Sequence, residues 1–135
     1  MRRAARTGDD KRILLVLLLR LVGDFRKTLE PLRVTPSQAG VLLLLHHHAD
    51  ARVTNTATEL GVSLATLSRT VTALVHKGWV AKRRAVKDDR VVALSLTRRG
   101  HTLACHIEQR VRHAEVTLTE QDRRDLHMSL KDSHA

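Results

Sequence analysis

A helical pattern of apolar positions lies in the middle of the chain, at residues 64–77. Apolar side chains recur there at a spacing of 3.6 residues, which predicts a helix with one buried face. Ser63 is expected to cap its first turn, and Gly78 to end it. A short helix is predicted just before it, at 57–60, with Gly61 in a left-handed conformation between the two. The buried face would consist of Leu64, Leu67, Val71, Leu74 and Val75.

The opposite face of the predicted 64–77 helix carries small, polar or basic side chains and no carboxylate. A face of this kind suits the DNA major groove, because it is narrow and offers hydrogen-bonding groups and a cation. Its members are Ala65, Thr66, Arg69, Thr72, Ala73 and His76, with Ser68 at the edge of the face.

A period of two replaces the helical period after Gly78. The alternation predicts strands at 80–84 and 91–96, joined by a short polar loop at 85–90. A helix, a turn, a second helix and a charged hairpin together form a winged helix-turn-helix. The expected fold class is therefore mainly α with a small β-hairpin.

An ordered set of residues through this region carries a family resemblance. The set is Glu59, Leu60, Gly61, Val62, Ser63, Leu74, Val75, His76, Lys77, Gly78, Trp79, Val80, Lys82, Arg83, Arg84, Asp89, Arg90, Leu96, Thr97 and Gly100. It resembles the MarR family of bacterial transcription regulators. The resemblance implies a homodimer that binds double-stranded DNA at a pseudo-palindromic operator, more often as a repressor, with a small-molecule effector. Two departures are Thr56, where the family usually has leucine, and Val91, where it often has a second arginine.

DNA contacts are expected from the second helix and from the wing. In the wing, the resemblance implies that Asp89 orients arginines and that Arg90 enters the minor groove; a solvated turn with an exposed ion pair is the alternative. The full set of predicted DNA-binding residues is Ser63, Ala65, Thr66, Ser68, Arg69, Thr72, Lys82, Arg84, Lys87, Asp89 and Arg90.

Long helices are predicted on both sides of the winged helix-turn-helix. The one at 10–30 is apolar on more than one side, with its main stripe at Leu14, Leu18, Leu21, Phe25 and Leu29, and so needs more than one covering surface. The one at 98–118 has a narrow stripe from Leu103 to Leu118, typical of helices that pack on a partner helix. Thr35 and Thr119 are predicted caps of two further helices, and residues 1–9 are expected to be frayed. We therefore expect a single domain, 1–135, with dimerisation helices at 10–32 and 98–135 around a DNA-binding region at 35–97.

The charge of the chain favours a polyanionic partner. The formal net charge is +10 and the pI is about 11.2. From 61 to 100, cations outnumber carboxylates nine to two, so the charge coincides with the predicted motif. Phe25 and Trp79 are the only two large aromatic residues, which disfavours single-stranded nucleic acid as a partner. A basic architectural protein that binds duplex DNA without sequence preference is the alternative from another functional class.

Enzymatic and membrane functions are not favoured. The sequence has no glycine-rich phosphate loop, no Cys-x-x-Cys pair and no His-Glu-x-x-His motif. The apolar run at 13–19 is too short to span a bilayer and is followed by charged residues, which indicates a helix of a cytoplasmic protein. The single Cys105 suits a reducing compartment. Its place in mid-helix near an apolar stripe argues against a redox sensor.

A metal site is a further alternative. His101 and Cys105 are spaced i, i+4, which puts both side chains within reach of a single ion. His46, His47 and His48 are candidates to complete the set, and some members of the resembled family sense zinc through the corresponding helices. No acidic ligand is evident nearby, and nine histidines make such a spacing common by chance. We therefore expect no cofactor, with a zinc-responsive regulator as the alternative.

Overall fold

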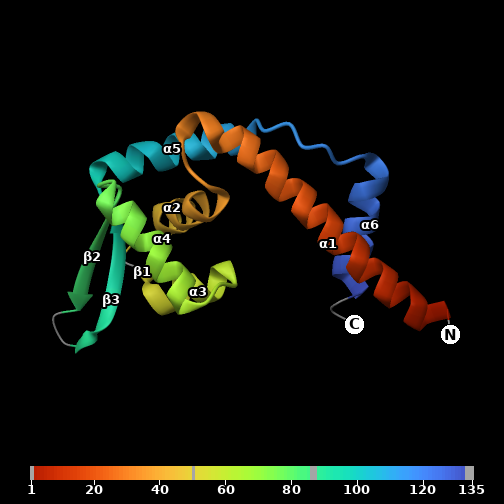
Figure 1. Ribbon diagram of the computed structural model, residues 1–135, viewed down its shortest axis with the longest axis horizontal. Coiled ribbons are helices and arrows are strands. Elements are labelled where there is room, and N and C mark those ends of the chain that lie inside the picture. Colours follow the sequence, from red (N-terminus) through yellow and green to blue (C-terminus); the bar gives the residue numbers. More distant parts are fainter. Residues whose placement is uncertain (1, 50, 86–87, 133–135) are drawn as a thin grey trace. The chain divides into compact units, whose positions relative to one another are not determined.

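The computed structural model describes residues 2–49, 51–85 and 88–132, and side chains over 11–49, 51–84 and 92–131. Its contacts divide the chain into two compact units. The central unit is 29–113. The terminal unit combines 1–28 with 114–135. The fold is mainly helical with a small antiparallel sheet, which confirms the predicted fold class (Figure 1).

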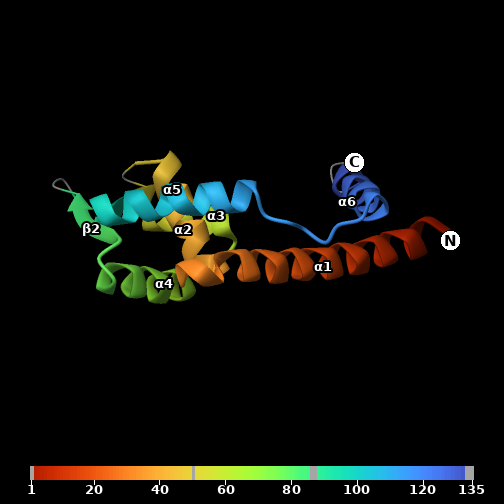
Figure 2. The same ribbon diagram turned by 90° about the horizontal axis from the view of Figure 1, so that it is seen from above.

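The central unit contains most of the secondary structure. A short 3-10 helix, η1 (Glu30–Leu32), leads into α2 (Pro36–His47), β1 (Ala51–Arg52) and α3 (Val53–Leu60). These are followed by α4 (Leu64–His76), β2 (Val80–Ala85), β3 (Asp88–Leu96) and α5 (Arg98–Arg112). Both ribbon views place α2 between α5 and α4 (Figures 1 and 2).

Helix starts in the central unit follow the predicted caps. The Thr35 hydroxyl accepts a hydrogen bond from the Gln38 amide, and the Gln38 side chain accepts one from the Thr35 amide, which is a complete capping box. Ser63 caps α4 by accepting from the Thr66 amide at 3.1 Å. Gly61, with φ of 66°, adopts the left-handed conformation that ends α3. These local signals fix where α2, α3 and α4 begin and end.

The sheet has the strand order β1-β3-β2, with both pairs antiparallel. Lys82 lies opposite Leu94, and Arg84 opposite Val92, so these four side chains share one face of the hairpin. The two-residue strand β1 pairs with β3 through Ala51 and Leu94. The hairpin is therefore attached on one side to the segment that begins α3.

One apolar core holds the central unit together. Leu42, Val41, Leu74, Leu94 and Ile107 are each completely buried, and they come from α2, α4, β3 and α5. Because interiors are closely packed, this core fixes α4 and the hairpin relative to α2 and α5.

The beginning of α5 lies directly against the turn that follows α4. The Thr97 hydroxyl donates to the Gly78 carbonyl at 2.6 Å and accepts from the Gly100 amide at 3.1 Å. A Cβ at Gly100 would lie 1.9 Å from the Trp79 carbonyl oxygen. Only glycine fits at this contact.

The terminal unit contains α1 (Arg2–Leu29), except for its last residue, and α6 (Glu120–Asp132). Arg20 and Asp122 form an ion pair between these helices at 3.0 Å. The carboxylate of Asp24 accepts hydrogen bonds from the Thr117 amide at 2.8 Å and from its hydroxyl at 2.9 Å. Thr119 and Asp122 cap α6 reciprocally, as predicted. No helix within the described residues is long and apolar enough to cross a membrane.

Three sequence expectations about the helices are wrong. Helix α1 begins at Arg2 rather than near residue 10, so residues 2–9 are helical rather than frayed. Helix α5 ends at Arg112 rather than at 118. Its apolar stripe packs on the chain's own core, since Ile107 is completely buried there. On α4, Leu64 and Val75 are 51% and 38% exposed, because they lie at the two ends of the buried face.

Candidate DNA-binding surface

The outward face of α4 is polar and basic, and the residues predicted on it are exposed apart from Ala73, which is half-buried. Leu67, Val71 and Leu74 anchor the other face of this helix in the core. The predicted contact residues on the helix are all exposed: Ala65, Thr66, Ser68, Arg69 and Thr72. Ser63, which precedes α4, is exposed as well. A rigid helix with an accessible face of this composition can enter a major groove.

Hydroxyl groups on α4 are already partly engaged within the helix. The Ser63 hydroxyl donates to Thr66 Oγ1 at 3.0 Å, and its oxygen is the cap acceptor for the Thr66 amide. The Thr72 hydroxyl donates to the Ser68 carbonyl at 2.8 Å. Since a hydroxyl has one proton, Ser63 and Thr72 can offer DNA only acceptor capacity in this arrangement. Arg69 is the cation on this face and can donate in a bidentate manner.

Basic side chains of β2 continue this surface onto the hairpin. Lys82, Arg83 and Arg84 are all exposed. The register of β2 with β3 puts Lys82 and Arg84 on one face and Arg83 on the other. Lys77, beyond the end of α4, lies over the Trp79 ring with its Nζ 4.8 Å from the ring centroid. The positive charge therefore follows the sequence from α4 along the first strand of the hairpin.

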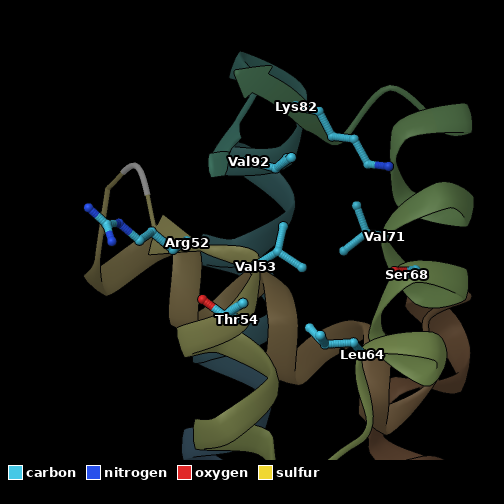
Figure 3. Close-up of a pocket in the computed structure, with 8 residues that line it drawn as sticks. All are labelled: Arg52, Val53, Thr54, Leu64, Ser68, Val71, Lys82 and Val92. Carbon is cyan, nitrogen blue, oxygen red and sulfur yellow. The ribbon is translucent and has the colours of Figure 1, made fainter. Parts of the chain in front are cut away.

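A pocket of about 350 Å³ lies between α4 and the hairpin. Figure 3 shows Lys82 extending from β2 toward α4, close to apolar side chains of the lining that include Val71 and Val92. Thr54 and Ser68 also line the pocket, whereas the Arg52 side chain extends away from the other labelled residues in Figure 3. The pocket thus combines one cation, Lys82, with an apolar interior next to α4.

The tip of the wing cannot be compared with the prediction. Lys87 lies outside the described residues. Asp89 and Arg90 belong to β3, but their side chains lie outside the described part. The expected roles of these three residues remain predictions.

The two predicted metal ligands are brought together with a third residue. Cys105 Sγ lies 4.0 Å from His101 Nε2 on α5, and His46, in the last turn of α2, joins them. One ligand atom from each of the three lies within 4.8 Å of the others. His48, at the C-cap of α2, is not part of this group.

Sequence reasoning missed two residues that the fold places at these sites. Arg52 lines the pocket beside α4, and it escaped notice because it precedes the basic stretch that begins at Gly61. Glu108 lies beside His46 and forms a short contact with His47, although more than 60 positions separate it from them. Only its position on α5, two turns after His101, could have indicated this proximity.

Comparisons with known proteins agree with this fold and surface. The model of the MarR family matches residues 34–92. No curated protein matched the chain.

Solved structures give matches over most of the chain. A cysteine-to-serine variant of Escherichia coli MarR in complex with operator DNA is 28% identical, with a TM-score of 0.79, and the match covers 93% of each chain. The transcriptional repressor CouR, bound to a 23-mer DNA duplex, is 28% identical, with a TM-score of 0.73 over 87% of this chain and 85% of that one. Reduced AbfR bound to DNA, at 21% identity and a TM-score of 0.76 over 98% and 95% of the two chains, shows the shared fold. The family match, the structural matches and the winged-helix fold together identify residues 34–92 of this chain as a domain of the MarR family of transcription regulators.

Proposed function

We propose that the chain acts as a homodimeric repressor that reads a pseudo-palindromic operator through α4 of each subunit. The observation that carries the proposal is the exposed, carboxylate-free face of α4, held on a buried apolar face and continued by the cations of β2. A repressor is favoured because CouR, a repressor, has the same fold at 28% identity.

Within the proposed complex, residues of α4 and of the hairpin have different tasks. Arg69 and Thr66 would contact base edges in the major groove, where hydrogen-bond patterns differ between base pairs. Lys82 and Arg84 would contact phosphates, which fixes the register of the protein without reading sequence. Arg90 would enter the minor groove beside the wing, held by Asp89.

Dimerisation is proposed through α1. Leu15, Leu18, Leu19 and Val22 follow an i, i+3, i+4, i+7 pattern and are 40–63% exposed, with Ile13 and Val16 exposed beside them. Such a stripe on a soluble chain is normally covered by another helix. Two subunits would present two copies of α4, and for helix-turn-helix dimers these lie about one DNA turn apart, roughly 34–36 Å. A pseudo-palindromic operator follows from this symmetry.

A small-molecule effector is also part of the proposal. The pocket between α4 and the hairpin has a volume within the usual range for small ligands, and Lys82 suits an anionic, partly apolar compound. A ligand there would compete with DNA for Lys82.

The net charge of +10 favours one rival, an architectural protein that binds duplex DNA without sequence preference. The test is selection of bound sites from a random duplex pool, followed by affinity measurements for selected and random duplexes at physiological salt. We expect a two-fold symmetric site and a preference of roughly a thousandfold or more. A ratio near one would establish the rival function.

A further inference from the structure

We propose that His46, His101 and Cys105 bind a divalent transition-metal ion of the zinc class, with Glu108 orienting the ring of His46. The four residues come from the end of α2 and from the first three turns of α5. This site is separate from the DNA-binding surface and rests on none of the roles proposed for it.

The distances suit a single ion. Cys105 Sγ and His101 Nε2 are 4.0 Å apart, and one ligand atom from each of the three residues lies within 4.8 Å of the other two. In a tetrahedral zinc site, bonds of about 2.0–2.3 Å put ligand atoms roughly 3.3–3.8 Å apart. The side chains therefore need to approach one another by only about 1 Å, which small χ rotations achieve.

The fold fixes the backbone positions of these residues before any ion binds. His101 and Cys105 lie one helical turn apart on the same face of α5. Their neighbours Ala104 and Ile107 are completely buried, and Leu45, next to His46, is 3% exposed. Core packing of α2 on α5 therefore fixes the backbones that carry the ligands, so that little conformational entropy is lost on binding.

The position of the His46 ring favours a bound cation. His46 Nδ1 is buried and has no hydrogen-bond partner among the described residues. Such a buried polar atom is costly unless it finds a partner, and a metal ion would supply one to the imidazole ring. The rings of His46 and His101 also lie with their centroids 4.8 Å apart, a close approach that a shared ion would stabilise.

Glu108 supplies an acidic group beside the ring of His46. Its Oε2 atom lies 3.9 Å from His46 Nε2, and its Oε1 atom contacts His47 Nε2. The carboxylate can orient His46 through a hydrogen bond to Nε2, which leaves Nδ1 for the ion. It also adds a negative charge that, together with the Cys105 thiolate, balances a divalent cation.

The ligand chemistry selects the class of ion. A thiolate and two imidazoles favour zinc and similar transition metals, whereas magnesium and calcium prefer oxygen ligands. On binding, the Cys105 thiol loses its proton to solvent, and each imidazole binds through a neutral ring nitrogen. A pocket lined in part by His46, His101 and Thr97 adjoins the group and gives an ion access from solvent.

Cobalt titration of the full chain tests the site directly. Cys105 is the only cysteine, so any thiolate-to-cobalt charge-transfer absorption must arise from it. We expect this absorption to saturate at one cobalt ion per subunit and to disappear when zinc displaces cobalt. Absence of the charge-transfer band at saturating cobalt would overturn the proposal.

Variants distinguish this site from incidental metal binding by other histidines. Cys105→Ser should abolish the charge-transfer band. His101→Ala and His46→Ala should each weaken zinc affinity by about 100-fold or more, and Glu108→Gln by about 10–100-fold. His106→Ala, which removes an exposed histidine next to Cys105, is the matched control and should leave zinc affinity unchanged.

Stability supplies a second readout that does not depend on spectroscopy. Zinc should raise the unfolding temperature of the wild-type chain and of His106→Ala, because an ion that binds only the folded state stabilises it. Zinc should not raise the unfolding temperature of His101→Ala. Because His101 is exposed, this variant should still fold. Equal zinc affinity and equal stabilisation in wild type and His101→Ala would show that the ion binds elsewhere.

Discussion

The central and terminal units bury their apolar residues to different extents. The central unit has a continuous core, with side chains from α2, α4, β3 and α5 that are completely buried. In the terminal unit, Leu17 is the one buried apolar residue among those with described side chains, while six large apolar residues of α1 are exposed. One unit therefore buries its apolar residues within a single chain, whereas the other leaves an apolar face of α1 exposed, as the proposed dimer interface requires.

The largest expected effect is on the α1 surface. The double variant Leu15→Glu/Leu19→Glu should weaken dimerisation by up to about 1.5–3 kcal/mol for each of the four leucines of the dimer, because glutamates in the interface would lose that burial. Sedimentation at micromolar concentration measures the change.

The control for this variant is Val75→Glu, which changes an exposed apolar residue of the central unit. It should leave the oligomeric state unaltered. A double variant that sediments like wild type would mean that α1 does not form the interface and that the contrast between the units has another origin.

A core substitution should affect the central unit almost as strongly. Ile107→Ala removes a completely buried side chain and should lower the free energy of unfolding by about 2–5 kcal/mol. Denaturant unfolding of wild type and variant gives this difference. Leu19→Ala, at a position that is 63% exposed, is the matched control and should cost far less in a monomeric background. Similar losses in both variants would contradict the assignment of the core to the central unit.

DNA recognition should respond to a smaller change on the surface of the central unit. Arg69→Ala should cost about 1–3 kcal/mol of specific binding and leave the unfolding free energy nearly unchanged, because Arg69 is exposed. Fluorescence anisotropy with the selected duplex measures the loss. Arg112→Ala removes the same charge from the end of α5 and should have little effect. If both variants lose affinity equally, Arg69 contributes only its charge.

The smallest effect is expected at Asp24, in the terminal unit. Hydrogen bonds from the Thr117 amide and hydroxyl, with nearby Lys27 and Arg20, lower the pKa of Asp24 from its ordinary value of 3.8. A lowered folded-state pKa means that this stabilisation is present above pH 3.8 and is lost as the pH falls through the folded-state value.

Hydrogen exchange at the Thr117 amide measures this contact. Protection should decline in wild type as the pH falls below 3.8, after correction for intrinsic exchange. Asp24→Asn should show weaker protection at neutral pH and little further decline with acid. If the protection of the Thr117 amide in Asp24→Asn depended on pH as it does in wild type, the charge of the Asp24 carboxylate would not stabilise this contact.

Local signals made much of the fold predictable. Caps at Thr35, Ser63 and Thr119 and the turn at Gly61 depend on residues within a few positions, and each is confirmed. The end of α5 depends on a distant partner, since Asp24 takes up the Thr117 amide that a continued helix would have used. Strand β1 is too short to show a period.

Site residues were predictable only where one helix face carries the signal. The exposed face of α4 follows from its spacing, and so does the pair His101 and Cys105 on α5. The positions of His46 and Glu108 depend on how α2 packs on α5, which no local pattern records. Which side of α1 is exposed could not be predicted for the same reason: Leu14 and Leu21 are partly buried, while Leu19 is exposed.

The contact between Gly100 and Trp79 limits which sequences can keep this geometry. Adding a single methyl group at Gly100 would place it 1.9 Å from a backbone oxygen, whereas real contacts of this kind stay above 3.0 Å. A relative with alanine here must therefore separate the start of α5 from the turn after α4 by at least about 1 Å. Since that turn fixes the end of α4, the helix proposed to enter DNA, variation at this one position offers divergent relatives a way to change how they approach DNA while every proposed contact residue stays the same.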